Sequence, residues 1–330
     1  MKAARFGVLL ANLGTPEAPT PEAVRRYLAE FLWDERVVDA PRPLWWLILN
    51  GFILRTRPAR VARGYASVWQ EEGSPLLVFG RLQQQALRAS LAEHFGEEIP
   101  VELAMTYGKP GMEEAGKALR DAGVERVLVL PLYPQFSRST TAAVFDRLAK
   151  ALKPCPHLPE LRFVRDYHDH PAYIAALANS VRDHWQRHGG SRGRLLMSYH
   201  GIPKRYAEAG DPYPRHCETT SRLLAEALGL DDDAWMMSYQ SRFGREEWLK
   251  PYTDETLKAW ARDGVEHVDI MSPAFSADCL ETLEELEVEN RDNFEQAGGK
   301  VYRYIPALND RADHIALLTT LVETHTQGWD

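Results

Sequence analysis

Two groups of residues in the second half of the chain carry side chains suited to proton transfer and metal binding. The first is His200, which ends a short apolar run and precedes Gly201 and Pro203, so a turn is expected to project its imidazole. A neutral imidazole accepts a proton or binds a borderline metal ion. The alternative is a loop histidine that only makes hydrogen bonds, and the spacing leaves both interpretations open.

The second group is a row of acidic residues. Glu281, Glu285 and Glu289 recur every four residues, and Asp278 precedes them. On a helix this spacing places the three glutamates along one face. Such a stripe is usually solvated because like charges repel, but this one follows a predicted buried strand. The second interpretation is therefore a row of carboxylates that leads inward and carries cations or protons.

The elements that must position these groups alternate along the chain. Short apolar runs rich in β-branched residues are separated by longer amphipathic stretches, which is typical of parallel strands joined by helices. The predicted strands are 6–11, 101–105, 126–130, 161–165, 195–199, 234–239, 267–271 and 301–304. The predicted helices are 21–32, 76–94, 112–122, 172–187, 217–228, 253–262 and 310–324. Ligands of such sheets bind beyond the carboxyl ends of the strands, where both groups lie.

The two sets of four strands also resemble each other in sequence. A shift of 141 positions places Lys117 on Lys258 and Gly123 on Gly264. The first strands of the two sets match as well if one residue is inserted, and His200 lies at that insertion. A duplicated α/β domain explains both matches.

We therefore predict an α/β protein of two similar domains, each with a four-stranded parallel sheet flanked by helices. The first domain covers 1–168 and contains an insertion at about 34–73 that has no counterpart in the second half. The second domain covers 169–307, and a final helix within 308–330 is expected to pack on the first domain.

The insertion contains an unusual apolar run from Leu44 to Leu54, followed directly by Arg55 and Arg57. A bilayer span needs about 20 apolar residues, so this run is too short to cross a membrane. Three interpretations remain: a buried core helix, an interfacial patch, or the wall of a site for a large flat ligand.

Composition excludes several classes of protein. The net charge of -8 argues against an extended phosphate-binding surface, so no nucleic-acid partner is expected. The 3 cysteines are far apart and form no C-x-x-C, which fits a reducing compartment. The apolar stretch near the start is too short for a signal peptide, and we expect a cytoplasmic protein. No glycine-rich phosphate loop follows a strand, which disfavours nucleotide enzymes.

Short motifs are spread along the whole chain in a fixed order. They are Leu10-Ala11-Asn12-Leu13-Gly14-Thr15-Pro16, Gly73-Ser74-Pro75-Leu76, Leu132-Tyr133-Pro134-Gln135-Phe136-Ser137, Ser198-Tyr199-His200-Gly201-Ile202-Pro203, Gly210-Asp211-Pro212-Tyr213-Pro214, Tyr239-Gln240-Ser241-Arg242-Phe243-Gly244 and the run 275–285. Each motif alone is weak. Together, in this order and spacing, they resemble the ferrochelatase family, and most of all its proteobacterial form that makes protohaem.

The resemblance implies a Rossmann-like chelatase fold and a lyase of haem biosynthesis that inserts Fe²⁺ into protoporphyrin IX. It implies that His200 is the family's invariant histidine and Glu281 its essential glutamate, both acting on the metal. The same comparison puts Glu285 and Glu289 on a path for iron or protons, and Asp278 joins them as a candidate relay. The residues expected to bind the porphyrin are Leu13, Tyr65, Tyr199, Tyr239, Phe275, Arg55 and Arg57.

The chain also departs from part of the family. Some members hold an iron–sulfur cluster on C-terminal cysteines, whereas this chain has no cysteine after Cys279, so neither a cluster nor another resident cofactor is expected. In the family the apolar insertion forms a lip over the porphyrin cleft, and transient contact with a membrane surface is a further interpretation. The alternatives are a non-catalytic haem or porphyrin carrier and a chelatase for another tetrapyrrole or metal, such as coproporphyrin or cobalt.

Overall fold

The computed structural model describes residues 6–244 and 246–329. The chain divides into two compact units. Unit 1 comprises Met1–Tyr133, Ser137–Asp166 and Asp310–Asp330, and unit 2 comprises Pro134–Phe136 and Tyr167–Asn309. The junctions lie within two residues of those expected from the sequence, and the short segment 134–136 joins unit 2.

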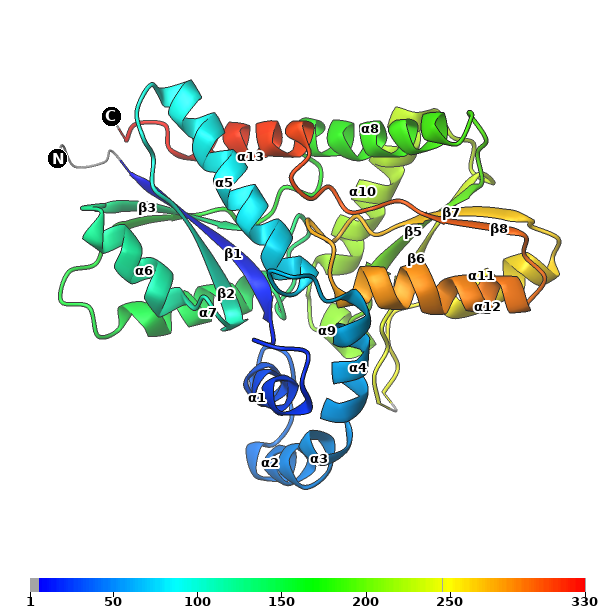
Figure 1. The fold of residues 1–330 in the computed structure, drawn as a ribbon, viewed down its shortest axis with the longest axis horizontal. Helices are drawn as coiled ribbons and strands as arrows, with labels where there is room; N and C mark the ends of the chain where they lie inside the picture. The colour runs from blue at the N-terminus through cyan, green and yellow to red at the C-terminus, as the bar shows by residue number, and fades with distance from the viewer. Residues whose placement is uncertain (1–5, 245, 330) are drawn as a thin grey trace. The chain divides into compact units, whose positions relative to one another are not determined.

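Unit 1 contains a parallel sheet in the order β2-β1-β3-β4. Its strands are β1 (Gly7–Thr15), β2 (Val101–Gly108), β3 (Arg126–Pro131) and β4 (Glu160–Phe163). Its main helices are α1 (Pro21–Leu32), α5 (Pro75–Phe95), α6 (Met112–Asp121), α7 (Thr141–Leu152) and α13 (Ala312–His325). Helices α6 and α7 cover one face of the sheet, and α5 crosses the other face beside α13 (Figure 1). Both faces are therefore buried, as parallel sheets require.

Unit 2 repeats this arrangement, with a parallel sheet in the order β6-β5-β7-β8. Its strands are β5 (Arg194–His200), β6 (Trp235–Gln240), β7 (His267–Met271) and β8 (Val301–Tyr304). Its helices are α8 (Pro171–Arg187), α9 (Lys204–Glu208), α10 (Tyr213–Leu228), α11 (Thr253–Arg262), α12 (Asn290–Gln296) and the π-helix η2 (Glu281–Glu289). Helices α8 and α10 pack together, and α11 packs with α12 around Trp260, Leu257 and Phe294 (Figure 1). The predicted fold class is confirmed.

The repeat extends into details of the strand ends. The N–H of Met105 in β2 donates to the carbonyl of Pro110 at 2.6 Å. The N–H of Tyr239 in β6 donates to the carbonyl of Pro251 at 2.8 Å. The two prolines lie 141 positions apart, the shift found in the sequence. In both units the chain therefore returns to cover the outer edge of an edge strand in the same way.

The insertion in unit 1 forms a series of short helices. They are α2 (Arg42–Ile48), the π-helix η1 (Leu49–Ile53), α3 (Leu54–Thr56) and α4 (Pro58–Val68). Trp45, Leu49 and Ile53 are buried, and the indole N–H of Trp45 donates to the carbonyl of Leu32 at 2.7 Å. A core-facing side thus exists, but it accounts for only part of the apolar run, because the other side is exposed.

The sequence pattern does not predict α7, although a helix must cross between β3 and β4. Its first residue, Thr141, follows Thr140, whose side chain makes no capping hydrogen bond. The usual N-terminal signal of a helix is therefore missing, and only the apolar spacing of Val144 and Leu148 against the sheet defines it.

Gly14 is a position where the backbone leaves no room for a side chain. Its φ is +113°, and a Cβ built there lies 1.7 Å from the carbonyl oxygen of Tyr107 on the adjacent strand. We expect Gly14→Ala to lower the free energy of unfolding by about 3 kcal/mol, because both the backbone conformation and the contact are unfavourable. Urea unfolding measures the loss. Gly51→Ala is the matched control because a Cβ at Gly51 meets nothing within 4 Å, and an equal loss in both variants would contradict the assignment.

Candidate functional site

His200 is the last residue of β5 and lies at the carboxyl edge of the unit 2 sheet. Its Nδ1 lies 2.7 Å from the carbonyl oxygen of Gly201. A carbonyl only accepts hydrogen bonds, so Nδ1 carries the proton and donates it. In the neutral imidazole this leaves the lone pair on Nε2, which is then the atom that accepts a proton or binds a metal.

Two aromatic side chains flank the imidazole. The rings of Trp248 and Phe275 each lie 6.5 Å from the His200 ring, centroid to centroid, and both side chains are partly exposed. The Trp248 indole N–H donates to the carbonyl of Phe243 at 2.8 Å, which fixes its position. Phe275 is among the residues predicted to bind the porphyrin. Trp248 is not among the residues predicted to bind the porphyrin, because it lies in the loop between β6 and α11 and belongs to none of the motifs.

Gly201 explains how Trp248 approaches so closely. A Cβ at Gly201 would lie 3.0 Å from the carbonyl oxygen of Gln240 and 3.2 Å from Cε3 of Trp248. The absence of a side chain therefore lets the indole lie against the turn that holds His200. A tryptophan in the loop after a strand end was the sequence signal for this contact.

The acidic segment is a π-helix, η2, whereas the sequence reasoning assumed ordinary helical spacing. Glu281 and Glu285 are partly exposed and Glu289 is exposed. Long π-helices are rare and occur frequently at functional sites. The i, i+4 spacing of glutamates is compatible with either helix type, so the sequence could not distinguish them.

Asp278, the candidate relay before the helix, is buried and fully hydrogen-bonded. Its Oδ1 accepts from the Tyr304 hydroxyl at 2.5 Å, the Thr282 hydroxyl at 3.0 Å and the Ala307 N–H at 3.2 Å. Its Oδ2 accepts from the Asn309 amide at 2.7 Å. These contacts support a role in anchoring the first turn of η2, and a relay through Asp278 stays a prediction.

Glu285 has the most perturbed carboxyl group of the acidic row. Its Oε1 accepts from the backbone N–H of Ser241 at 2.8 Å, and its Oε2 accepts from the Ser241 hydroxyl. Burial raises the pKa of Glu285 to about 7, and the charges of Glu281 and Glu289 add to the effect, while the bonds from Ser241 oppose it. At neutral pH this group therefore both binds and releases a proton.

Two of the expected porphyrin contacts lie elsewhere in unit 2. Tyr199 is fully buried and its hydroxyl lies 2.9 Å from that of Ser221 on α10. Tyr239, its partner across the two strands, is buried as well. The reason is the alternation of side chains along a strand, which turns Tyr199 to the face opposite its neighbour His200. The structure gives both tyrosines core positions, which argues against direct contact with a ligand.

The other expected porphyrin contacts belong to unit 1. Leu13 in β1 is partly exposed, and Tyr65 in α4 is buried with its ring 6.0 Å from that of Trp69. Arg55 and Arg57 are exposed at the end of the apolar segment. As porphyrin contacts these four residues stay predictions.

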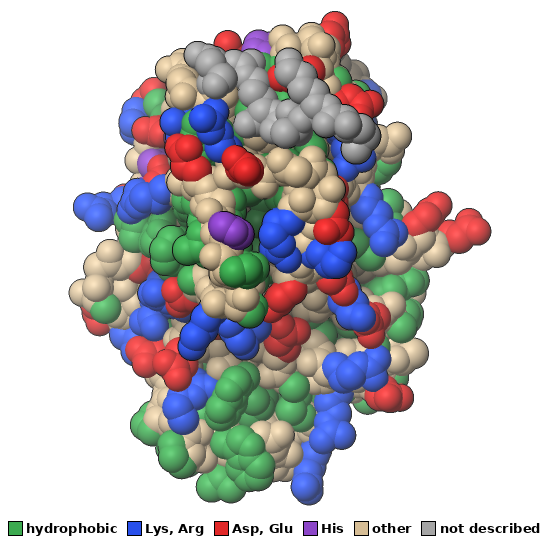
Figure 2. Space-filling view, turned by 90° about the vertical axis from the view of Figure 1, so that its left-hand side faces the viewer, with side chains coloured by type: hydrophobic (Ala, Val, Ile, Leu, Met, Phe, Trp, Pro, Cys, Tyr) green, Lys and Arg blue, Asp and Glu red, His purple; other side chains and the backbone are tan. Residues whose placement is uncertain are grey.

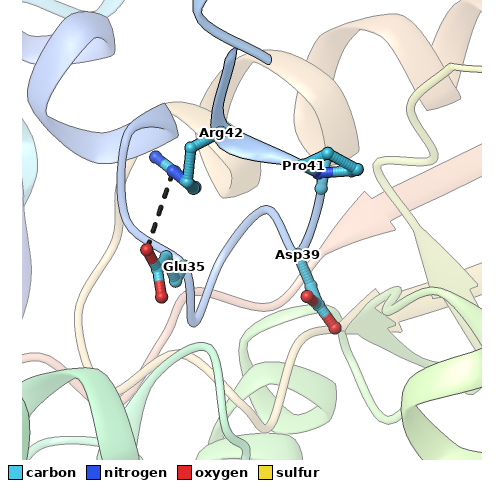
Figure 3. A pocket seen from close by; sticks show the side chains of 5 residues that line it. Glu35, Asp39, Pro41 and Arg42 are labelled. Atoms are coloured by element: carbon cyan, nitrogen blue, oxygen red, sulfur yellow. Dashed lines mark ion pairs between the residues drawn. The ribbon is translucent and has the colours of Figure 1, made fainter. Parts of the chain in front are cut away.

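Unit 1 also has a shallow pocket just before the apolar segment (Figure 3). It is lined by Glu35, Asp39, Ala40, Pro41 and Arg42. Arg42 and Glu35 form an ion pair across it, with Nε 3.7 Å from Oε1. None of the predicted site residues lines this pocket, so it is not the candidate site.

The elevated pKa of Glu285 has a measurable effect on stability. In the unfolded chain the pKa returns to near 4.5, so between pH 4.5 and 7 the folded protein binds more protons and its stability falls as the pH rises. The difference between the folded and unfolded pKa values corresponds to about 3 kcal/mol in the free energy of unfolding. We expect Glu285→Gln to be similar to the wild type at pH 4.5 and progressively more stable toward pH 7.5 in urea unfolding. A constant difference across this range would show that the pKa is ordinary.

Comparisons with known proteins identify the family. A family model described as Ferrochelatase matches residues 5–326. A protein named Ferrochelatase from an Enterobacter species is 57% identical to this chain, and the match covers 98% of this chain and 99% of that protein. Another protein of that name, from Vibrio cholerae, is 56% identical, and the match covers 97% of this chain and 98% of that protein. A third, from Nitrosococcus oceani, is 56% identical over 99% of this chain and 88% of its own.

Two solved structures share the fold at low sequence identity. SirB from Bacillus subtilis with Fe³⁺ has a TM-score of 0.55 and 12% identity over 74% of this chain and 90% of its own. CbiX, the terminal enzyme for biosynthesis of siroheme in denitrifying bacteria, has a TM-score of 0.50 and 14% identity over 96% of this chain and 98% of its own. The family match over nearly the whole length, together with these identities, shows that the chain belongs to the ferrochelatase family.

Proposed function

We propose that this protein inserts Fe²⁺ into protoporphyrin IX to form protohaem, as a lyase in haem biosynthesis. The observation that carries the proposal is the geometry around His200. Its Nε2 is left as the accepting atom by the bond to Gly201, and the acidic π-helix is tied to the neighbouring strand end by Gln240. A base and a row of oxygen ligands thus belong to one sheet edge.

Metallation has two requirements that these residues can meet. The macrocycle must lose two pyrrole protons, and the iron must exchange bound water for ring nitrogens. We assign the proton transfer to Nε2 of His200 as a general base and the oxygen contact with iron to Glu281. One imidazole and carboxylates hold Fe²⁺ only moderately, which suits a metal that is passed on.

A planar porphyrin points its lone pairs inward, away from an approaching metal, so the ring must bend. Binding energy from its remote vinyl, methyl and propionate groups can supply that distortion. Phe275 and Trp248 are suited to contact the macrocycle beside His200. We assign Leu13 and Tyr65 to the same ligand and Arg55 or Arg57 to its propionates, which need cationic partners.

Glu285 and Glu289 are proposed to carry iron or protons toward Glu281. Glu285 exchanges its proton near pH 7, so it can accept protons and attract cations without a large energetic cost. Glu289 is exposed at the far end of the helix, where hydrated iron is accessible. The Fe²⁺ is a substrate, and the absence of an iron–sulfur cluster stays a prediction that sulfide analysis of the purified protein can check.

The apolar segment is proposed as the entrance for the porphyrin and as a site of transient membrane contact. Leu44, Trp46, Leu47, Ile48 and Phe52 are exposed, and Figure 2 shows green side chains gathered at the lower end of the view, where α2, η1 and α3 lie. Exposed arginines follow at 55, 57, 60 and 63. An apolar face with a cationic rim matches the interface of an anionic bilayer.

Among the described residues, no helix has both the length and the apolarity to cross a bilayer. Contact through the apolar segment would therefore be peripheral. We also propose that the reaction takes place in the cytoplasm, because the three cysteines are free thiols, as expected in a reducing compartment. The acidic net charge supports the expectation that no nucleic acid is bound.

The decisive test of the function is turnover. Protoporphyrin IX and Fe²⁺ are added anaerobically, and haem is followed by its absorption spectrum. We expect many equivalents of haem per protein chain. Formation of no more than one equivalent would indicate a carrier. Higher kcat/KM with coproporphyrin or with Co²⁺ would assign a different substrate to the same site.

The residue roles are tested by His200→Ala and Glu281→Gln. We expect each to lower kcat by about 10²–10⁴-fold, the range for a lost general acid or base, with folding retained. Glu287→Gln is the matched control, because Glu287 lies on the same π-helix and its ion pair with Arg291 is exposed. Near-normal kcat in either test variant would refute the role assigned to that residue.

Membrane contact is tested by cosedimentation with vesicles of phosphatidylcholine alone or with one-third phosphatidylserine. We expect binding only to the anionic vesicles and at least about tenfold weaker binding for a Trp46→Ser, Phe52→Ser double variant. Leu158→Ser is the control, because Leu158 is a highly exposed apolar residue of unit 1 outside the segment. Equal losses in the two variants, or equal binding to both vesicle types, would rule out this mode of contact.

A further inference from the structure

The carboxyl end of β6 touches both the strand of His200 and the acidic π-helix. Gln240, its last residue, is buried and is the cross-strand partner of His200 in the sheet. Its amide Nε2 donates to the backbone carbonyl of Glu281 at 3.0 Å. Its Oε1 accepts from the hydroxyl of Ser198 in β5 at 2.7 Å. One side chain thus connects the strand of the proposed base to the first residue of η2.

Ser241, the next residue, holds the second carboxylate of the helix. Its backbone is left-handed, with φ of 65°, which is uncommon for a residue other than glycine. In this conformation its N–H donates to Oε1 of Glu285 at 2.8 Å, and its hydroxyl donates to Oε2. Both oxygens of one carboxylate are therefore bound by a single residue, which fixes the plane and direction of the group.

The turn that follows β6 contacts the start of α11 through Arg242. The guanidinium of Arg242 pairs with Glu255 at 2.8 Å and Asp254 at 3.3 Å, both in the first turn of α11. It also lies 4.2 Å above the ring of Tyr252. These contacts join the residue after Ser241 to α11, while the two donors of Ser241 are aimed at Glu285.

We propose that Gln240 and Ser241 are positioning residues with separate tasks. Gln240 sets Glu281 at its working distance from His200, and Ser241 orients the Glu285 carboxylate to receive a divalent cation. This inference rests on the proposed function and deepens it. The two tasks differ because Glu281 is assigned to the metal-insertion step, whereas Glu285 is assigned to delivery.

The separation predicts different kinetic effects. Gln240→Met keeps the size of the side chain and removes the donor to Glu281, so kcat should fall by about 10²-fold while the KM values for iron and porphyrin change little. Ser241→Gly is compatible with the left-handed backbone, keeps its N–H and removes the hydroxymethyl side chain. The KM for iron should rise about tenfold, with kcat and the KM for porphyrin unchanged.

Matched controls separate positioning from general damage. Gln135→Met removes another buried glutamine amide of unit 2, one that bonds Thr220 at 3.0 Å, and should leave kcat unchanged. Ser191→Ala is the control for Ser241→Gly: it removes a serine hydroxyl just before the amino end of β5 and should leave the KM for iron unchanged. If Gln240→Met does not fold, Ser198→Ala releases the other end of the same amide and should give a smaller loss of kcat.

A measurement without turnover distinguishes failure of this inference from failure of the proposed function. Binding of Co²⁺ to the porphyrin-free protein is followed by calorimetry, and we expect about tenfold weaker binding for Ser241→Gly and no change for Gln240→Met. Absence of haem synthesis by the wild type would refute the function alone. Unchanged iron KM and Co²⁺ affinity in Ser241→Gly, or equal kcat losses in Gln240→Met and Gln135→Met, would overturn the positioning roles.

Discussion

The buried carboxylate of Asp278 fixes where the acidic π-helix begins, and the rest of the site depends on that point. A charged group without partners is very unfavourable in a protein interior. Here it accepts from two hydroxyls, one backbone N–H and one amide, contributed by Thr282, Tyr304, Ala307 and Asn309. The start of η2 is thereby joined to β8 and to the segment after it. The helix is held from outside, which lets its internal hydrogen bonds adopt the less favourable π pattern.

The local pattern of the sequence was enough to predict the two sheets but not the π-helix. The β-branched runs predicted each strand to within a few residues. The repeat at a shift of 141 positions predicted that the strands form two similar sets. Glutamates four apart, however, fit an α-helix and a π-helix alike, since the hydrogen-bond register leaves no trace in residue type. The same limit applied to Tyr199 and Tyr239: the motif located them, but the face that each occupies depends on strand alternation and packing against α10. Trp248 was missed because the loop that holds it has no periodicity.

The apolar insertion shows why composition alone left three interpretations open. Its buried residues, Trp45, Leu49 and Ile53, satisfy the expectation of a core helix. Its exposed residues satisfy the expectation of an interfacial surface, and Phe52 retains 65% of its accessible area. The run is apolar on both sides because each side faces a different environment. A periodicity search cannot separate the two, since an all-apolar stretch has no polar face to mark the solvent.

A single residue distinguishes the end of β1 in unit 1 from the equivalent end of β5 in unit 2. In both units a glycine, Gly14 or Gly201, lies against a carbonyl of the adjacent strand, so the turn itself is shared. Gly7 pairs with Val127 as Arg194 pairs with Val268, so the two strands stay in step up to the glycine and the insertion expected from the sequence does not occur. The position of His200 in unit 2 is that of Leu13 in unit 1. A substitution at that one position would thus suffice to place an imidazole at the strand end without altering the scaffold.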